Sequence, residues 1–387
     1  MKKCNYSIGI DVSKDSFVVS IKENRFVKSN LSFSMDKYGF ENFASQTIQF
    51  KDSSICAYEP TSIYHINLVN FLKEKGYNLC MVNPYKVKQF FRFFANKPTK
   101  TDKIDSKILA DFIQFNHQSQ NSTSCQKEQF RYLVREKENI SSQIAQIKSE
   151  IKRIIYLVFP EIVRNGNVFS SGIISILKIF PSAYSIKSVS ESQFISSVEK
   201  HLPKRGKKPD LKLIYELACQ SIAYSYPHFE KILLLKIQYL EFLENQMNYI
   251  SQLIEKLADQ IYKREIEILT SIPGIAKKST IYFISEIMNI GRFASYKKLI
   301  GYCGLDPVIK QSGKYKGVWK ISKRGNSHVR RIAFIMAESV RKMTPYFRDY
   351  YIKKINEGKS YRQAIIATST RLLKVIYYLL LDNRLFS

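Results

Sequence analysis

The sequence predicts an α/β domain at the N-terminus, then a long helical arm, then a mostly helical C-terminal domain. Three observations indicate this order: apolar runs of strand length alternate with helical spacing at the start, heptad-like spacing occurs twice in the middle, and helical spacing dominates the end. The length of 387 residues exceeds the size at which one hydrophobic core stops growing, so several domains are expected. The expected domains are 1–120, 121–263 and 264–387.

The N-terminal domain combines short apolar strands with helices. The helices are indicated by 3.6-residue spacing in Ile63–Lys75, which ends at Gly76, a fitting C-cap, and in Asp102–Phe115. The first two strands are expected to pair as a hairpin, and the other two to be buried. The expected strands are 6–10, 16–21, 54–58 and 78–82.

Two long helices are expected in the middle of the chain. Apolar residues recur at intervals of four and three residues between 140 and 158, and again between 243 and 261. This spacing favours an antiparallel coiled-coil arm, and a helical bundle packed on the protein's own core is an equally good interpretation. The segment between the helices is less regular and contains the basic run 204–208.

The chain is strongly basic, with 61 Lys and Arg residues against 33 Asp and Glu and a net charge of +28. Such a charge predicts a polyanionic partner, although a merely soluble basic surface would have the same composition. An anionic membrane is the other polyanion, but the longest apolar runs, such as 375–381, are far shorter than the ~20 residues that span a bilayer. No membrane association is therefore expected.

The cysteines and histidines argue against a zinc site or a disulfide framework. Six cysteines are scattered without C-x-x-C spacing, and only five histidines are present. Any metal must then be held by oxygen. Asp11 and Asp15 stand where a secretory signal would need its apolar stretch, so a cytoplasmic location is expected.

Four carboxylates form the candidate metal site. Asp11 and Glu59 each end an apolar strand, where an unpaired charge would lose hydration energy. Asp102 and Asp105 share one face at the start of a helix, whereas Asp111 should point elsewhere. Singly, Asp102 fits an N-cap and Asp11 fits a turn. Together the four acids predict a pair of Mg²⁺ or Mn²⁺ ions that serves phosphoryl transfer.

The motifs around these acids resemble those of a known family. The series I-G-I-D-V-S-K-D, Y-E-P-T, V-N-P and K-T-D-K-I-D-S-K is similar to the RuvC-like domain of the DEDD-motif transposases of insertion-sequence family 110. The resemblance implies an RNase H-like fold. It also assigns the four-acid signature to Asp11, Glu59, Asp102 and Asp105. Pro60 departs from the small residue expected after the glutamate.

The C-terminal part resembles the second domain of the same family, a mostly helical transposase domain. Residues 269–276 (L-T-S-I-P-G-I-A) are similar to a helix-hairpin-helix turn, with Ala276 in place of the usual second glycine. An ordinary Pro-Gly turn is the alternative. The motifs L-I-G-Y-C-G, Q-S-G and I-S-K-R-G-N-S-H-V-R-R imply that Ser312 is a nucleophile, and Ser322 and Ser327 are rivals in a similar setting.

Basic residues are dense beside both sets of motifs. This density favours contacts with phosphates over a solvated helix face. The expected nucleic-acid-binding residues are Lys97, Lys100, Lys277, Lys278, Lys314, Lys316, Lys323, Arg324, Arg330 and Arg331.

The resemblance implies a bacterial insertion-sequence recombinase that cuts and rejoins DNA by Mg²⁺-dependent phosphoryl transfer, through a covalent phosphoserine link and with a bridge RNA as guide. It also implies a homodimer or higher homo-oligomer, in which the carboxylates of one subunit and the serine of another complete one site. One alternative is a hydrolytic nuclease of the junction-resolvase type, which needs the carboxylates but not Ser312. The other is a non-catalytic nucleic-acid-binding scaffold, which needs neither.

Overall fold

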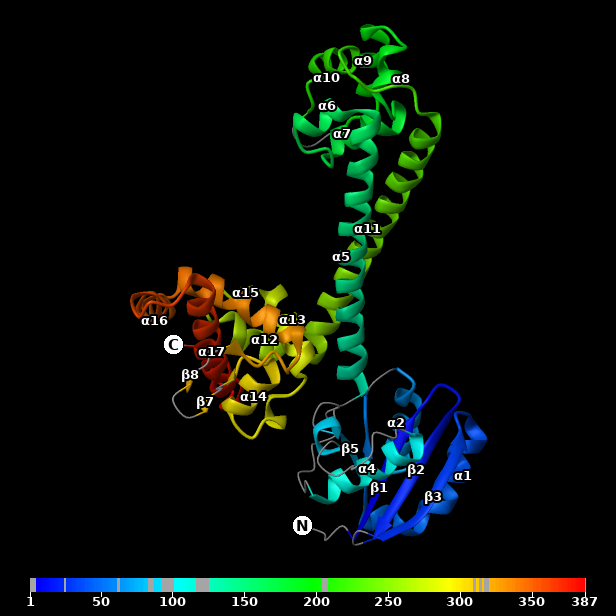
Figure 1. Ribbon diagram of the computed structural model, residues 1–387, viewed down its shortest axis with the longest axis vertical. Coiled ribbons are helices and arrows are strands. Elements are labelled where there is room, and N and C mark those ends of the chain that lie inside the picture. The colour runs from blue at the N-terminus through cyan, green and yellow to red at the C-terminus, as the bar shows by residue number, and fades with distance from the viewer. Residues whose placement is uncertain are drawn as a thin grey trace. The chain divides into compact units, whose positions relative to one another are not determined.

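Figure 1 shows the computed structural model of the chain, which divides into two compact units: 1–131 together with 261–387, and 132–260. For Cys125 and for residues 311, 312, 315 and 316, only the backbone is described. The structure describes residues 5–23, 26–60, 63–82, 87–91, 101–115, 125–203, 208–308, 311–312, 315–316 and 320–386.

A sheet of five strands within the described residues forms the centre of the N-terminal domain. The strands are β1 (Tyr6–Val12), β2 (Ser16–Glu23), β3 (Phe26–Ser34), β4 (Ser54–Tyr58) and β5 (Leu79–Met81). Their order is β3-β2-β1-β4-β5, with β1–β2 and β2–β3 antiparallel and β1–β4 and β4–β5 parallel. All four predicted strands are confirmed. The edge strand β3 was not predicted, because most of its side chains are exposed and its sequence has no apolar run.

Helices cover both faces of this sheet. They are α1 (Lys37–Thr47), the short 3₁₀ helix η1 (Ile48–Ser53), α2 (His65–Glu74) and α4 (Asp102–Phe115). Phe43 of α1 and Leu72 of α2 share a core with Ile8 and Ile10 of β1, whereas α4 packs on the opposite face against Ala57. The predicted bounds of α4 are confirmed, and Gly76 has the left-handed φ of 78° expected of the cap after α2.

The helix α4 lies unusually close to β1. A Cβ atom on Gly9 would stand 1.9 Å from the main-chain oxygen of Ser106, so only glycine fits at this position of the strand. Beside this contact, the hydroxyl groups of Ser20 and Ser106 form a buried hydrogen bond of 2.7 Å. Lys22 and Asp111 form an ion pair of 2.5 Å farther along the helix. The main chains of strand and helix are thus in direct contact.

The unit 132–260 contains long antiparallel helices with shorter helices at one end (Figure 1). The long helices are α5 (Cys125–Val158), which begins in the other unit, and α11 (Pro227–Ile261). Lys148 pairs with Glu244 at 2.8 Å and Glu150 pairs with Lys236 at 2.6 Å, so the residue numbers rise on one helix as they fall on the other. The seam is apolar, and Ile151 is fully buried. The antiparallel pairing agrees with the expected arm, and its coiled-coil character stays a prediction.

The segment between these helices is more regular than expected. It folds into short helices that share one apolar cluster with the long pair. The short helices begin at polar caps such as Ser182, Ser190 and Asp210, whose side chains accept main-chain hydrogen bonds. They are α6 (Pro160–Arg164), α7 (Ser171–Ile179), α8 (Ala183–Lys187), α9 (Glu191–Glu199) and α10 (Leu211–Cys219).

The C-terminal domain is mostly helical, as expected. Its helices are α12 (Lys263–Thr270), α13 (Lys277–Ile287), η2 (Ile290–Arg292), α14 (Tyr296–Cys303), α15 (Ser327–Met343), α16 (Pro345–Asn356) and α17 (Tyr361–Leu381). Among the described helices, α17 is long and apolar enough to cross a membrane by length and composition alone. Half of that apolar stretch is buried inside the protein, as in the core helix of a globular domain.

The first turns of α5 carry a buried carboxylate. Glu128 is 2% exposed, and its Oε1 has no hydrogen-bond partner among the described residues. Burial raises the pKa of Glu128, and the nearby charges of Lys73 and Arg131 oppose that rise. Burial, and then the charge of Glu128, also raise the pKa of Tyr58 in β4. The start of α5 therefore packs against the sheet through a polar cluster that is incompletely satisfied.

We expect Gly9→Ala to destabilise the protein. The added Cβ would meet the main chain of α4, so strand and helix must separate, and overpacking of this kind costs about 1–3 kcal/mol. Urea unfolding followed by circular dichroism should show a lower midpoint. The matched control is Gly166→Ala, because no described atom lies within 4 Å of a Cβ at that position. Equal midpoints for the two variants would contradict the contact.

Glu128→Gln should stabilise the protein in a pH-dependent way. Because the folded state raises the pKa of this acid, stability is lost as pH rises through the raised value, and glutamine removes that loss. The variant should unfold at higher urea concentration than wild type at pH 8, and the difference should shrink toward pH ~4, near the ordinary glutamate pKa. Glu136→Gln, on the exposed side of the same helix, should change neither midpoint. A destabilised Glu128→Gln protein at pH 8 would refute this reading of the buried acid.

Candidate active site

Two of the predicted acids stand at neighbouring positions at the carboxyl ends of two adjacent strands. The parallel register of β1 and β4 pairs Ile10 with Tyr58, and the next residues along the two strands are Asp11 and Glu59. Neighbouring strands lie about 4.8 Å apart. Both acids are half-buried. The sheet therefore places Asp11 and Glu59 side by side at the carboxyl ends of parallel strands.

The helix α4 points its first turn toward the same end of the sheet. Ser106 contacts Ser20, which is paired with Gly9, whereas Asp111 contacts Lys22 near the other end of β1. The helix therefore runs antiparallel to β1, and its N-terminus faces the carboxyl end of the strand. Asp111 points away from the predicted site, as expected.

The first turn of α4 reaches the level of Asp11. Asp102 precedes Ser106 by four residues, or about 6 Å of helix, and Asp11 follows Gly9 by about 6.6 Å of strand. Asp11 also lies two residues beyond Gly9, so it belongs to the face of the sheet that α4 covers. Asp105 is half-buried and Asp102 is exposed. The four predicted acids thus share one corner of the domain.

The side chains at this corner do not form a closed metal cage. Within the described ranges, no three His, Cys, Asp or Glu side chains lie close enough together to hold a metal ion. The donors are carboxylate oxygens, which suit Mg²⁺ and Mn²⁺ by their chemistry. Metal binding by Asp11, Glu59, Asp102 and Asp105 therefore stays a prediction. Lys97 and Lys100 lie outside the described residues.

The predicted nucleophile lies on a β-ribbon where a loop was expected. The ribbon consists of β6 (Pro307–Val308), β7 (Gln311–Ser312), β8 (Tyr315–Lys316) and β9 (Lys320–Ile321). β6 pairs with β9 and β7 pairs with β8, both antiparallel. Ser312 is opposite Tyr315, so only residues 313 and 314 separate the paired ends. The main chain of Ser312 is therefore at the tip of the hairpin.

The rival serines have different surroundings. The Ser322 hydroxyl donates to the Asp306 carboxylate at 2.6 Å, and its main-chain N–H donates to the Asp306 carbonyl at 2.8 Å. These bonds hold the two ends of the ribbon together, which is a structural use of that hydroxyl. Ser327 is the first residue of α15 and is exposed.

The turn at 269–276 joins α12 to α13 and packs on α15. Gly274 has a left-handed φ of 99°, and a Cβ there would lie 3.0 Å from the Val340 Cα. Ala276 occupies the N-cap of α13 without a side-chain hydrogen bond, and Lys277 and Lys278 follow it on the surface. Uncapped N–H groups beside exposed lysines suit a phosphate contact.

The other predicted basic residues divide into exposed and structural ones. Lys323, Arg324 and Arg331 are exposed beside the ribbon. Arg330 instead donates from its guanidinium to the Cys303 carbonyl at 3.2 Å, so it holds α14 against the start of α15. Of the remaining two, Lys314 lies outside the described residues and Lys316 is described by its backbone alone.

A buried acid that the sequence did not reveal supports the base of the ribbon. Glu286 is 3% exposed and accepts a hydrogen bond of 2.6 Å from the Asn326 side-chain amide. The side-chain Oδ1 of Asn326 in turn caps α15 by accepting a hydrogen bond of 2.9 Å from the His328 main-chain N–H. The sequence signal for Glu286 was its position inside the apolar helix α13, because a buried charge needs a polar partner.

Comparisons with known proteins agree with this arrangement of two motif regions. Residues 8–160 match the DEDD-type IS110 transposase family, and residues 266–352 match the family described as "Transposase IS116/IS110/IS902 family". The first region covers the carboxylate corner, and the second covers the turn at 269–276 and the ribbon.

Individual relatives match parts of the chain. The insertion element IS116 uncharacterized 44.8 kDa protein of Streptomyces clavuligerus is 29% identical over 121 residues, or 31% of this chain and 30% of the relative. The IS900 uncharacterized 42 kDa protein of Mycobacterium paratuberculosis is 32% identical over 124 residues, or 32% and 31%. The pilin gene-inverting protein of Moraxella bovis is 28% identical over 163 residues, or 39% and 51%.

These matches span about a third to a half of the lengths of the relatives. The two family matches lie in the N-terminal and the C-terminal parts of the chain. The chain therefore carries both transposase domains of the IS110 family and is a homologue of the IS116 and IS900 proteins.

Proposed function

We propose that this protein is a DNA recombinase of the insertion-sequence type, which cuts DNA strands and joins them to new partners. The observation that carries the proposal is the corner at which Asp11, Glu59 and the first turn of α4 meet. Carboxylate oxygens are the donors that Mg²⁺ and Mn²⁺ prefer, so this group of acids suits a divalent cation. In a chain of net charge +28 with transposase domains, a cation shared with DNA phosphates is the simplest use of the corner.

The proposed metal site uses all four acids. The strands β1 and β4 hold Asp11 and Glu59 in neighbouring positions, and Asp102 and Asp105 stand in the first turn of α4, which faces the same end of the sheet. When bound, Mg²⁺ or Mn²⁺ stabilises charge on the attacking and leaving oxygens of a phosphodiester. The half-buried setting of Asp11, Glu59 and Asp105 strengthens their interaction with a cation, since less water screens it.

Ser312 is the proposed nucleophile. Its hydroxyl oxygen attacks the phosphorus of a phosphodiester, so a serine–phosphate bond forms while the bond from phosphorus to one deoxyribose oxygen breaks. The serine proton passes to a base, and the leaving oxygen takes up a proton. A deoxyribose hydroxyl of another strand then attacks the phosphoserine, which restores the serine and joins the strands. The hairpin tip supports this role because it presents the Ser312 main chain at the end of a ribbon.

We also propose a guide RNA and an oligomer, both of which the resemblance to the family implies. A structured bridge RNA would select the DNA sequences, because basic side chains beside the motifs contact phosphates without reading bases. A homodimer or higher homo-oligomer would let the carboxylates of one subunit act with Ser312 of another, because 207 positions and two long helices separate Asp105 from Ser312.

Ser312→Ala should abolish a covalent protein–DNA adduct. Wild-type protein incubated with a nicked DNA substrate and Mg²⁺, then denatured, should yield an adduct that maps to the peptide containing Ser312, because the leaving strand cannot return. The matched control is Ser327→Ala, an exposed serine outside the ribbon, which should keep the adduct. Undiminished cleavage by Ser312→Ala, with no adduct in wild type, would refute the serine mechanism and favour a hydrolytic nuclease.

Asp11→Asn and Glu59→Gln should each remove metal binding. In wild type, saturating Mn²⁺ should raise the free energy of unfolding by about 2–3 kcal/mol at a hundred times its Kd, as ligand linkage requires. The variants should lose most of this stabilisation together with cleavage. Asp15→Asn changes an exposed acid just beyond β1 and should behave as wild type. Full Mn²⁺ stabilisation in both variants would show that the corner does not hold the metal.

A further inference from the structure

A cavity in the C-terminal domain is lined by residues that belong neither to the carboxylate corner nor to the ribbon. It lies along one side of α17 and has a volume of about 400 Å³, within the ~300–1,000 Å³ range of small-ligand sites. Its lining combines cations with aromatic rings, and no acidic residue is among the described residues that line it. The charged and aromatic lining residues are Arg371, Lys374, Arg384, Tyr346, Tyr378 and Phe386.

Arg371 is a cation of this cavity that packs on two aromatic rings. Its guanidinium carbon lies 4.9 Å from the Tyr346 ring centre and 5.2 Å from that of Tyr350, so two rings of α16 hold it in place. Its Nε is buried and has no hydrogen-bond partner among the described residues. A buried donor without an acceptor costs free energy. The guanidinium also lines the cavity, where its charge favours an anionic oxygen.

Lys374 adds a second charge beside Arg371 on the same helix. Its Nζ lies 5.1 Å from the ring centre of Tyr296, whose ring lies 6.1 Å from that of Tyr378. Arg384 contributes less, because it pairs with Asp382 at 3.4 Å on the surface. Arg371 and Lys374 together therefore favour a phosphate group, which can accept from both.

The aromatic lining is partly open to solvent. Tyr346 is 45% exposed and Tyr378 is 39% exposed, which leaves ring surface available to a ligand. Every nucleic-acid base has a π-face that stacks on such rings, and a phosphate is joined to each base through the sugar. Rings beside paired cations therefore match a nucleotide whose base is not paired in a duplex.

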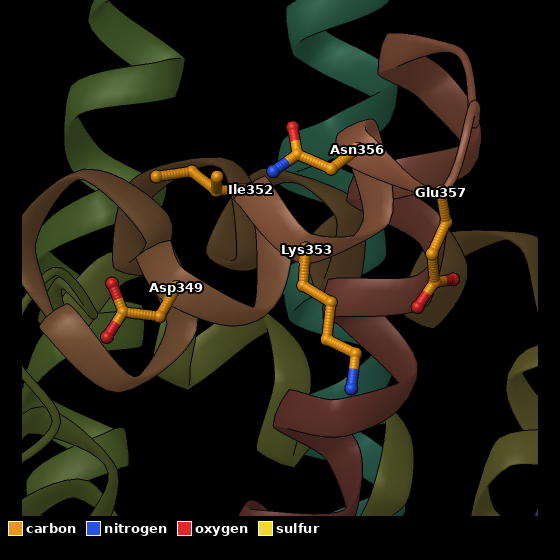
Figure 2. A pocket seen from close by; sticks show the side chains of 5 residues that line it. All are labelled: Asp349, Ile352, Lys353, Asn356 and Glu357. Carbon is orange, nitrogen blue, oxygen red and sulfur yellow. The ribbon is translucent and has the colours of Figure 1, made fainter.

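A second concavity of about 460 Å³, along α16, lacks these features. Figure 2 shows that its side chains come from one helix and its C-terminal end, and that Asp349, Lys353 and Glu357 point in different directions. Its charges are mixed, and no aromatic ring is among the described residues that line it. Lys353 therefore serves as a matched control for a cation in the same domain.

We propose that the cavity along α17 binds one unpaired nucleotide of a single-stranded nucleic acid, with the base on Tyr378 and the phosphate on Arg371 and Lys374. The chemistry is shared by RNA and DNA. The presence of such a strand in the reaction rests on the proposed function, whereas the binding itself rests on the cavity. An unpaired guide nucleotide or an opened DNA strand would thereby be bound by residues other than the catalytic groups.

The test measures binding of short fluorescent oligonucleotides to the full-length protein without divalent metal. Tyr378→Ala should weaken single-strand binding about tenfold, and Tyr378→Phe should not, because the phenyl ring still stacks. Lys374→Ala should reduce the slope of log affinity against log salt by about 0.7, the value for one phosphate of a single strand. Lys353→Ala should change the single-strand affinity less than twofold, within roughly ±0.5 kcal/mol for a surface change.

Duplex DNA and the two kinds of single strand separate the outcomes. Duplex affinity should fall no more in Tyr378→Ala than in Lys353→Ala, because a paired base cannot enter the cavity. A loss confined to the RNA or to the DNA strand identifies the natural ligand and supports the proposal. Wild-type affinity in Tyr378→Ala, or equal losses for single strand and duplex, would overturn the cavity proposal alone. Wild-type protein that binds no nucleic acid would overturn the proposed function as well.

Discussion

The close approach of α4 to β1 at Gly9 is the constraint on which the N-terminal domain depends. Only a residue without a Cβ lets the main chain of Ser106 reach the strand. The Ser20–Ser106 hydrogen bond then holds the helix at one point, and the Lys22–Asp111 ion pair holds it at a second. A helix held at two points cannot slide along the strand. Its acidic first turn is therefore kept at the carboxyl end of the sheet.

The ribbon that carries the proposed nucleophile depends on a similar contact between main chains. A Cβ on Gly325 would lie 2.1 Å from the Tyr302 carbonyl oxygen, so the segment after the ribbon packs directly on α14. Ser322 bonds to Asp306 across the base of the ribbon, and Arg330 donates to main-chain carbonyls beside it. The base of the ribbon is thus held by hydrogen bonds and by a glycine contact. Both candidate catalytic elements are positioned by backbone packing.

The large positive charge is divided between structural and available cations. Lys22 neutralises Asp111 inside the N-terminal domain, and Arg341 pairs with Glu338 on α15. Cations that are paired within the protein in this way contribute little to a surface that binds phosphates. Lys278 at the start of α13 is exposed, and Arg371 lines a cavity and has a buried Nε without a hydrogen-bond partner among the described residues. The local environment of each basic residue therefore matters more for nucleic-acid binding than their number.

The sequence by itself determined the elements whose signals are local. Asp102–Phe115 was predicted and found with the same bounds, because its apolar spacing and acidic first turn act within one helix. The four acids were also placed correctly at strand ends and a helix start. Only the tertiary structure decided how those acids stand relative to one another, that Pro307–Val308 pairs with Lys320–Ile321, and that Arg371 packs on two tyrosines of another helix. These features depend on register and packing between distant segments, which no local period encodes.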